Sequence, residues 1–127
     1  MQEKHLYEYA ILRVVPKVER EEFINVGVLL CCKKENFLCC KVQLDKSKLH
    51  ALDPEADFSI LSDYIKSLEL ICEGKNELSP ISLQDSASRF RWLTAPRSSM
   101  LQTSRPHGGL SADLESTLED LFNTYVK

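Results

Sequence analysis

The chain has 127 residues, of which 43% are hydrophobic and 28% are charged, with only four glycines and five prolines. This length and composition predict one globular domain over residues 1–127, and they exclude a disordered or fibrous protein. The formal net charge of -3 argues against a protein that coats nucleic acid or anionic membrane by its bulk charge, and it leaves a local basic site as the remaining way to bind either.

The sequence shows no sign of a membrane span or a secretory signal. The longest apolar run, VGVLLCC at residues 26–32, is far shorter than the ~20 residues that cross a bilayer. The first residues lack the basic-then-apolar pattern of a secretory signal, so we expect a cytoplasmic protein without membrane contact. The odd number of cysteines, five, fits a reducing compartment in which thiols stay free.

The first third of the chain predicts three strands. Residues 6–15 are rich in aromatic and β-branched side chains and end at Pro16, which is typical of a strand. The charged segment 16–23 follows as a short helix or an exposed loop. Residues 24–32 and 37–45 then predict a β-hairpin. Because its first strand is apolar on both faces, we expect that strand to be central and the second to lie nearer an edge.

The register of this hairpin depends on its loop. If residues 35–36 form a two-residue turn, Cys31 faces Cys40 and one face of the hairpin is nearly all apolar. The cysteines at 31–32 and 39–40 are adjacent in sequence, so neighbouring thiols point to opposite faces and cannot converge on one metal ion. We therefore expect no metal site, and no P-loop or dinucleotide fingerprint indicates a cofactor.

The middle of the chain predicts one long amphipathic helix. Asp53 can cap it, apolar residues recur at three- and four-residue steps from 58 to 72, and Gly74 is a plausible end. Residues 75–86 are rich in turn formers, which predicts a loop with a short extended piece at 81–83.

The last third combines an irregular segment with a second helix. Residues 86–95 fit either a short helix or a strand, and SSMLQTS at 98–104 looks extended. The segment RPHGGLS, at 105–111, then leads into an amphipathic helix for which Ser111 can act as the cap. Together these elements predict an α+β fold, in which two main amphipathic helices pack against a mostly antiparallel sheet.

The irregular segment holds an unusual share of the positive charge. Four of the six arginines fall within it, and no lysine or acid lies between residues 89 and 110. A guanidinium group presents a planar fork that suits phosphate or carboxylate, whereas lysine is the usual choice for solubility alone. The four arginines are Arg89, Arg91, Arg97 and Arg105.

Three interpretations of these arginines are open. One is a phosphate, carboxylate or nucleotide pocket, assisted by glycines 108–109 and the backbone amides of the last helix, with His107 as hydrogen-bond donor or general acid or base. Another is pairing with the chain's own acids, such as Glu22 or Asp113. The third is a protein interface, in which arginine and Trp92 are typical anchors.

Two blocks of the sequence, residues 7–30 and 89–122, resemble the bacterial family catalogued as domain of unknown function 3037. The family pattern has an arginine and a proline after the first strand, an E-F-x-N-V-G-V core, and an R-F-x-W-L-x-A-P-R-S run followed by Q-x-S and a histidine. These positions are Arg13, Pro16, Glu22, Phe23, Asn25, Val26, Gly27, Val28, Arg89, Phe90, Trp92, Leu93, Ala95, Pro96, Arg97, Ser98, Gln102, Ser104 and His107. The chain departs from the pattern at Glu21, where a glycine often precedes the E-F pair, and at Arg105, where a small residue or proline is common.

The resemblance implies a compact bacterial cytoplasmic protein and brings no assigned activity. Family members are often encoded beside a protein that resembles HipA-type toxin kinases, which implies a HipA-like kinase as a candidate partner in a toxin-antitoxin neighbourhood. We expect a non-enzymatic protein-interaction module. The alternative is an enzyme or binding protein for a phosphorylated or nucleic-acid substrate, with the arginines as anion clamps and His107 as acid or base.

The candidate ligand- or partner-binding residues come from both ends of the chain. They could meet if the central strand lies beside the arginine segment, so contact between Asn25 and the region of Arg97 is the key expectation. The candidate residues are Arg13, Glu22, Asn25, Arg89, Arg91, Arg97, Ser98, Gln102, Ser104, Arg105 and His107.

Overall fold

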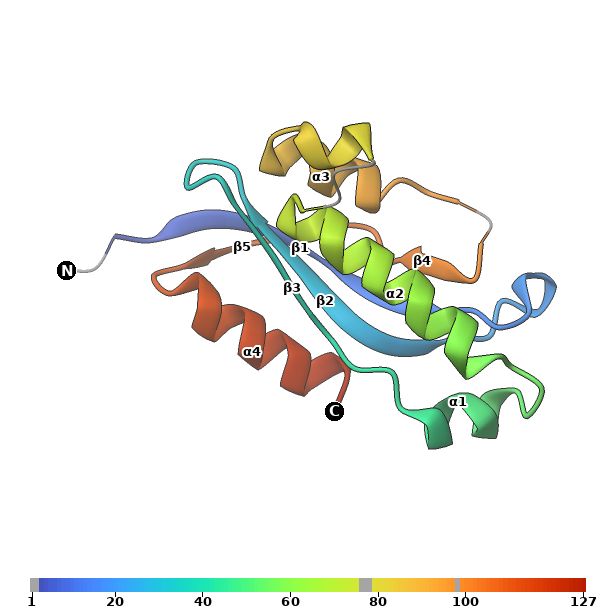
Figure 1. The fold of residues 1–127 in the computed structure, drawn as a ribbon. Coiled ribbons are helices and arrows are strands. Elements are labelled where there is room, and N and C mark those ends of the chain that lie inside the picture. Colours follow the sequence, from blue (N-terminus) through green and yellow to red (C-terminus); the bar gives the residue numbers. More distant parts are fainter. Residues whose placement is uncertain (1–2, 76–78, 98) are drawn as a thin grey trace.

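The computed structural model describes residues 3–75, 79–97 and 99–127. Its strands are β1 His5–Val14, β2 Ile24–Cys32, β3 Phe37–Val42, β4 Leu101–Thr103 and β5 His107–Ser111. They form one antiparallel sheet in which β2 lies between β3 and β1, while β4 and β5 both pair with the other side of β1 (Figure 1). The predicted central position of β2 and the edge position of β3 are therefore confirmed.

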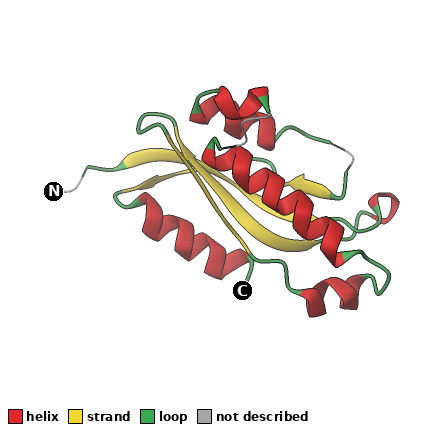
Figure 2. Ribbon diagram, in the orientation of Figure 1, coloured by secondary structure: helices red, strands yellow, loops and turns green. Residues whose placement is uncertain are grey.

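Helices cover both faces of this sheet. One face packs against α4 (Leu114–Tyr125), and the other packs against α2 (Phe58–Glu73) and α3 (Ser86–Leu93), while α1 (Lys46–Leu52) follows β3 at one end (Figures 1 and 2). The predicted α+β fold is confirmed.

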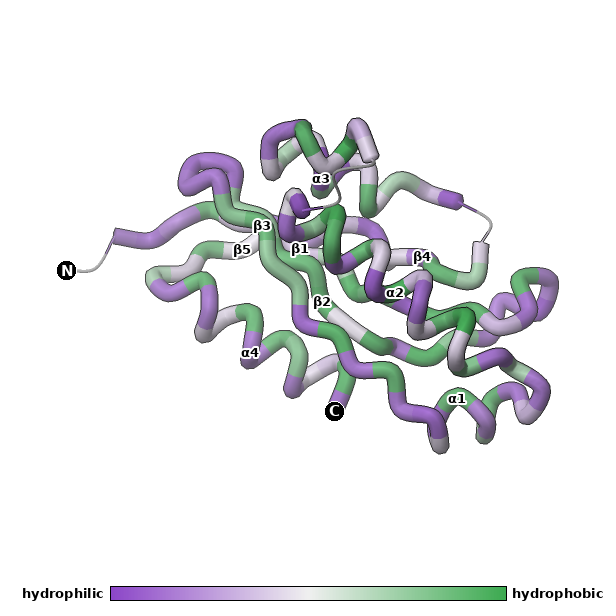
Figure 3. The backbone as a smooth tube through the Cα atoms, in the orientation of Figure 1, coloured by the Kyte–Doolittle hydropathy of each residue, from purple (hydrophilic) through white to green (hydrophobic). Residues whose placement is uncertain are grey.

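The central strands are buried on both sides. On the α4 face, Ile11 and Val28 pack against Phe122, and on the opposite face Ala10 and Leu29 belong to the cluster beneath α2 and α3. Figure 3 shows hydrophobic residues along β2 and hydrophilic residues at the tip of the β2–β3 hairpin. Burial on both faces explains why these strands read as nearly continuous apolar runs.

The β2–β3 hairpin is two residues out of the predicted register. Leu29, and not Cys31, stands opposite Cys40, because the loop spans the four residues 33–36 instead of two. Asn36 adopts a φ of 49° in this loop, a left-handed conformation that asparagine tolerates. A shift of two residues keeps every side chain on its face, so the apolar pattern predicted the faces correctly but could not determine the register.

The region before the long helix differs from the prediction. Asp45 caps a separate short helix, α1, and Asp53 ends that helix instead of starting the next one. The cap of α2 is Asp57, and Gly74 ends the helix as predicted, with a φ of 72°. The sequence did not indicate α1 because Leu49 is its only buried residue, which gives no apolar periodicity.

Two segments after α2 form helices. The piece at 81–83, expected to be extended, belongs to a 3-10 helix at Pro80–Leu83. Of the two alternatives for 86–95, the helix is the one that forms, with Asp85 as its cap.

Residues 107–111 form strand β5, which corrects the expectation of a loop at a helix N-terminus. Gly109 pairs with Tyr7 of β1, and a Cβ added to it would lie 2.5 Å from the Tyr7 hydroxyl, so a side chain there would displace that ring. Helix α4 is capped by Asp113, not by Ser111. Residues 108–109 therefore belong to the sheet and not to the N-terminus of α4, which begins at Leu114.

Candidate functional site

The four arginines of the segment 89–105 do not line one pocket. Arg91 and Arg105 are exposed, and Arg91 donates a hydrogen bond to the Ser88 hydroxyl at 3.1 Å. None of the four forms an ion pair with a residue that the structure describes. The described acids therefore do not neutralise them, which argues against internal pairing as their role.

Arg89 has a structural role at the end of α2. Its Nη1 donates to the backbone carbonyl of Gln84 at 2.6 Å, and its Nη2 donates to that of Cys72 at 3.3 Å. A Cβ added to Gly74, which ends the helix, would lie 3.5 Å from the guanidinium carbon. A cation in this place satisfies these backbone carbonyls and offsets the helix dipole. Arg89 therefore serves the fold through its two Nη groups, while its Nε is buried without a hydrogen-bond partner.

The two sequence blocks meet on the α4 face of the sheet, in what we call the Arg13 cleft. On β1, Arg13 stands opposite Asn25 of β2 and Gln102 of β4. Two cavities of about 260 and 320 Å³ share Arg13 and Phe23 as lining residues. The first is also lined by Tyr9, Ile11, Asn25, Ser104, His107 and Tyr125, and the second by Val15, Val18, Glu21, Arg97 and Gln102. Asn25 lines the first cavity and Arg97 the second, so their regions border adjoining cavities, while the expected contact between them stays a prediction.

Arg13 lies at the boundary between these cavities. Its guanidinium carbon is 4.3 Å from the centroid of the Phe23 ring. Its Nε is buried without a hydrogen-bond partner, and no described acid pairs with the group. A buried polar atom without a partner is uncommon in folded proteins, and bound water or a ligand ordinarily supplies the missing partner.

Asn25 adds an acceptor beside this donor. Its Nδ2 donates to the backbone carbonyl of Tyr125 at 3.1 Å, which fixes the orientation of the amide. Its Oδ1 is buried and has no hydrogen-bond partner. The first cavity therefore offers a cationic donor and a neutral acceptor, both unpaired within the described chain.

Aromatic rings form one wall of the cleft. The Tyr9 ring lies 5.5 Å from the His107 ring and 6.3 Å from the Tyr125 ring, measured between centroids. A hydrogen bond with Tyr125, together with burial, raises the pKa of Tyr9 to about 12. Tyr9 is therefore neutral at physiological pH, and the wall adds no negative charge beside Arg13.

Ser104 and Gln102 support the cleft from the edge of the sheet. The Ser104 hydroxyl accepts a hydrogen bond from the backbone N–H of Ile11 at 2.8 Å, and its own N–H donates to the Ile11 carbonyl at 2.8 Å. These bonds continue the sheet between β4 and β5, so this hydroxyl serves the fold. Gln102 donates through Nε2 to the Ser99 carbonyl at 2.8 Å, while His107 lies exposed at the rim.

Other candidates lie elsewhere. Glu22 forms an ion pair with Arg20 and lines a different, smaller cavity, and Ser98 lies outside the described residues. Sequence reasoning overlooked Tyr9 and Tyr125, which it assigned to a strand and to the apolar stripe of a helix. The only available signal was the position of Tyr9 on the same strand face as Arg13, four residues along.

Glu21 is the one acid among the described residues that line the cleft. Its φ of 55° is left-handed, a conformation that is unfavourable for residues with a Cβ and natural for glycine. The glycine that the family resemblance implies at this position would adopt this conformation without strain. Glu21 forms no ion pair with a described cation, so it leaves Arg13 open.

The cysteines are free thiols and do not build a site. Burial raises the pKa of Cys31 to about 11, and a hydrogen bond with Cys40 plus burial raises that of Cys72. These two thiols stay protonated, and so unreactive, near neutral pH.

Within the described ranges there is no group of three or more His, Cys, Asp or Glu residues placed to hold a metal ion. No helix in that part of the chain is long and apolar enough to cross a bilayer.

Fold and cleft together define a small α+β domain with an arginine-centred, aromatic-lined cleft. The chain belongs to the family described as protein of unknown function (DUF3037), which matches residues 9–126. This range includes all the residues of the Arg13 cleft, and it confirms the resemblance seen in the sequence. No curated protein and no solved structure matches the chain.

Proposed function

We propose that this protein is a binding module whose Arg13 cleft takes a phosphate or carboxylate group of a partner. The observation that most supports this role is the guanidinium of Arg13, which borders both cavities and has a buried Nε without a partner. Arginine binds such groups through two parallel hydrogen bonds. Arg97 lines the second cavity and adds a further positive charge.

The surroundings of Arg13 indicate what else the bound group contains. Phe23 and Tyr125 are 44% and 41% exposed at the cleft, which leaves ring surface for a planar or apolar substituent. The free Oδ1 of Asn25 suits a hydrogen-bond donor on the same ligand. Cavities of about 260 and 320 Å³ suit one or two side chains and are small for a large cofactor.

An acidic or phosphorylated segment of a protein meets these requirements. Arginine and aromatic residues at one surface are the usual anchors of protein interfaces. The HipA-like kinase that the family resemblance implies is the partner we propose to test first. Catalysis receives less support, because the hydroxyl of Ser104, which lies near His107 in the cleft, is held by backbone hydrogen bonds.

Titration with inorganic phosphate and with phenyl phosphate tests the anion site directly. We expect backbone amide NMR shifts to change at Arg13, Phe23 and Asn25, and phenyl phosphate to bind more tightly because its ring packs on Phe23 and Tyr125. The Arg13→Met variant should weaken phenyl phosphate binding at least tenfold, since a hydrogen bond to a charged group contributes about 1.5–3 kcal/mol.

Arg91→Met is the matched control, because Arg91 is exposed on α3 and lines neither cavity of the cleft. It should bind phenyl phosphate as the unchanged protein does. Equal losses in the two variants, or shift changes that map away from the cleft, would contradict the proposal. In co-purification with the HipA-like kinase, Arg91→Met should still form the complex and Arg13→Met should not.

A further inference from the structure

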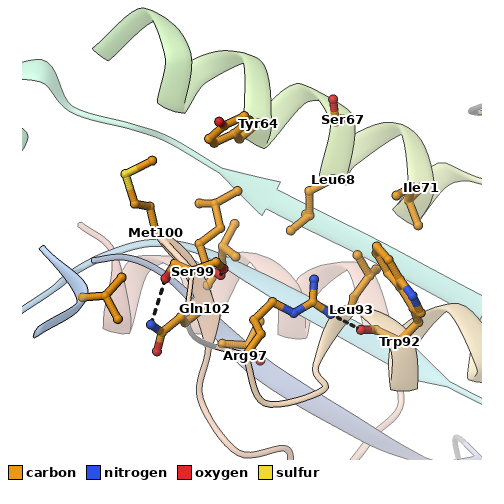
Figure 4. Close-up of a pocket in the computed structure, with 14 residues that line it drawn as sticks. Tyr64, Ser67, Leu68, Ile71, Trp92, Leu93, Arg97, Ser99, Met100 and Gln102 are labelled. Atoms are coloured by element: carbon orange, nitrogen blue, oxygen red, sulfur yellow. Dashed lines mark hydrogen bonds between the residues drawn. The ribbon is translucent and has the colours of Figure 1, made fainter. Parts of the chain in front are cut away.

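A larger cavity lies on the opposite face of the sheet, between α2, α3 and β4 (Figure 4). Its volume is about 550 Å³, which falls within the range of small-molecule sites. Leu68 and Ile71 line it from α2, Leu93 from α3, and Met100 and Leu101 from the segment that enters β4. The lining is therefore mainly apolar, and it is built by three elements that the core holds in place.

Two aromatic side chains of this cavity stay accessible. Tyr64 of α2 and Trp92 of α3 line it and are 49% and 40% exposed. Figure 4 shows Tyr64 and Trp92 projecting from different helices toward the space between α2 and β4. Large exposed rings around an apolar hollow leave surface for an apolar ligand to cover.

Arg97 is the only charged residue among the described residues that line this cavity. Its Nε donates to the Ala95 carbonyl at 3.3 Å, its Nη2 donates to the Trp92 carbonyl, and its guanidinium carbon lies 4.8 Å from the Trp92 ring centroid. These contacts fix the group beside the cavity. They leave Nη1 without a hydrogen bond to any described residue, and no described acid pairs with Arg97.

We infer that this cavity binds a small amphiphile, an unbranched apolar chain that ends in an anionic head group. The chain lies between α2 and α3 against Leu68, Ile71 and Leu93, and the head group pairs with the free side of Arg97. A single cation without a neighbouring acid selects an anionic head, and the apolar lining selects a hydrocarbon tail. Val18, Arg97 and Gln102 line both this cavity and one cavity of the Arg13 cleft, whereas Arg13 does not line this cavity. The inference therefore shares Arg97 with the proposed function but does not rest on Arg13.

Trp92 is the only tryptophan of the chain, so its fluorescence reports directly on the cavity. Titration at neutral pH with hexanoate, octanoate and decanoate, below their micelle thresholds, should give saturable changes. Affinity should rise about fourfold with each added methylene that is buried. Octanoate should bind at least tenfold more tightly than octanol, because only octanoate can pair with Arg97, and octyl phosphate tests whether the site prefers a phosphate head.

Variants separate the head-group contact from the tail contact. Arg97→Met should reduce the affinity for octanoate to that for octanol, with calorimetry as a second readout because the variant also removes the cation beside Trp92. Ser67→Phe, at an exposed position that lines the cavity, should weaken every chain length. Arg91→Met and Arg13→Met should leave octanoate binding unchanged.

Three results would each overturn the inference: no saturable signal with any of the carboxylates, equal affinities for octanoate and octanol, or an octanoate preference that survives Arg97→Met. A loss of octanoate binding in Arg13→Met would also contradict it, because that residue does not line this cavity. Failure of phenyl phosphate to bind would leave these expectations intact, so the two proposals fail separately.

Discussion

The two faces of the sheet use arginine in opposite ways. On the face covered by α2 and α3, Arg89 donates to the backbone carbonyls of Gln84 and Cys72 and so closes the end of a helix. On the α4 face, Arg13 stacks on Phe23, keeps a buried Nε unpaired and meets no described acid. Both arginines have a buried Nε without a partner. The two Nη groups of Arg89 donate to the backbone, whereas the guanidinium of Arg13 forms no hydrogen bond or ion pair with a described residue, so Arg13 is the one left for a ligand.

This difference shows that local charge density is a poor guide to the binding arginine. The segment 89–105 is the most arginine-rich part of the sequence, yet its arginines lie in different places. One is at a helix end, two are on the surface and one lines the apolar cavity. Arg13 is an isolated arginine at the other end of the chain, but strand pairing places it beside Asn25 and Gln102. Strand pairing, not charge clustering, assembles the candidate site.

Replacing Arg89 should have the largest effect on stability. Arg89→Met removes two hydrogen bonds from a charged group to carbonyls, so we expect the free energy of unfolding to fall by about 2 kcal/mol. Affinity for phenyl phosphate should be unchanged, because Arg89 lies outside the Arg13 cleft. Urea denaturation and the phosphate titration measure the two quantities on the same samples.

Arg13→Met is the matched comparison for Arg89→Met. We expect it to lose phenyl phosphate binding while its free energy of unfolding stays nearly unchanged. The methionine keeps an apolar contact with Phe23 and removes an unpaired buried donor. If Arg13→Met proves the more destabilising of the two, Arg13 also serves the fold and the contrast between the faces disappears.

Replacing Glu21 should have smaller effects on phosphate binding and on stability than replacing Arg13 or Arg89. Glu21→Gly removes the acid from the Arg13 cleft, so phenyl phosphate should bind severalfold more tightly. It should also raise the free energy of unfolding by about 0.5 kcal/mol. Relief of the left-handed backbone, worth about 1–2 kcal/mol, is partly offset by the flexibility that glycine adds to the unfolded chain.

A second variant divides these two effects. Glu21→Gln removes the charge but keeps a side chain at a φ of 55°, so it should strengthen phosphate binding without the gain in stability. A gain in stability equal to that of Glu21→Gly would show that charge, and not backbone strain, is the cause.

Much of the fold could be predicted because it depends on local patterns. The aromatic and β-branched composition of β1, the apolar run of β2 and the apolar stripe of α4 each reflect local burial. The hairpin register was wrong because a shift of two residues keeps the same faces. Helix α1 was missed because one buried leucine, Leu49, gives no periodic signal.

The site was predicted only in part. The family resemblance supplied Arg13, Asn25, Arg97, Gln102 and His107, all of which line the Arg13 cleft. It could not show that the Ser104 hydroxyl accepts a hydrogen bond from the backbone of β1, or that residues 107–111 form a strand. Both depend on which strands pair across ninety or more residues, and one sequence does not contain that information.

The smallest expected effect concerns the cap of α3. The Asp85 carboxylate accepts a hydrogen bond from the backbone N–H of Ser88 at 2.8 Å, and hydrogen bonds from the side chain and backbone of Ser88 lower the pKa of Asp85. Since its folded pKa lies below its unfolded pKa, the stability that it contributes is complete above about pH 4 and is lost as the pH falls through the folded pKa.

Asp85→Asn can still cap the helix but does not titrate. Between about pH 5 and pH 2, the urea midpoint of the unchanged protein should therefore fall slightly further than that of the variant. Trp92 lies on α3, so its fluorescence reports this transition near the cap. Parallel pH profiles would show that the cap is insensitive to its charge. In that case α3 is held mainly by the burial of Phe90 and Leu93, and its stability does not depend on the charge of Asp85.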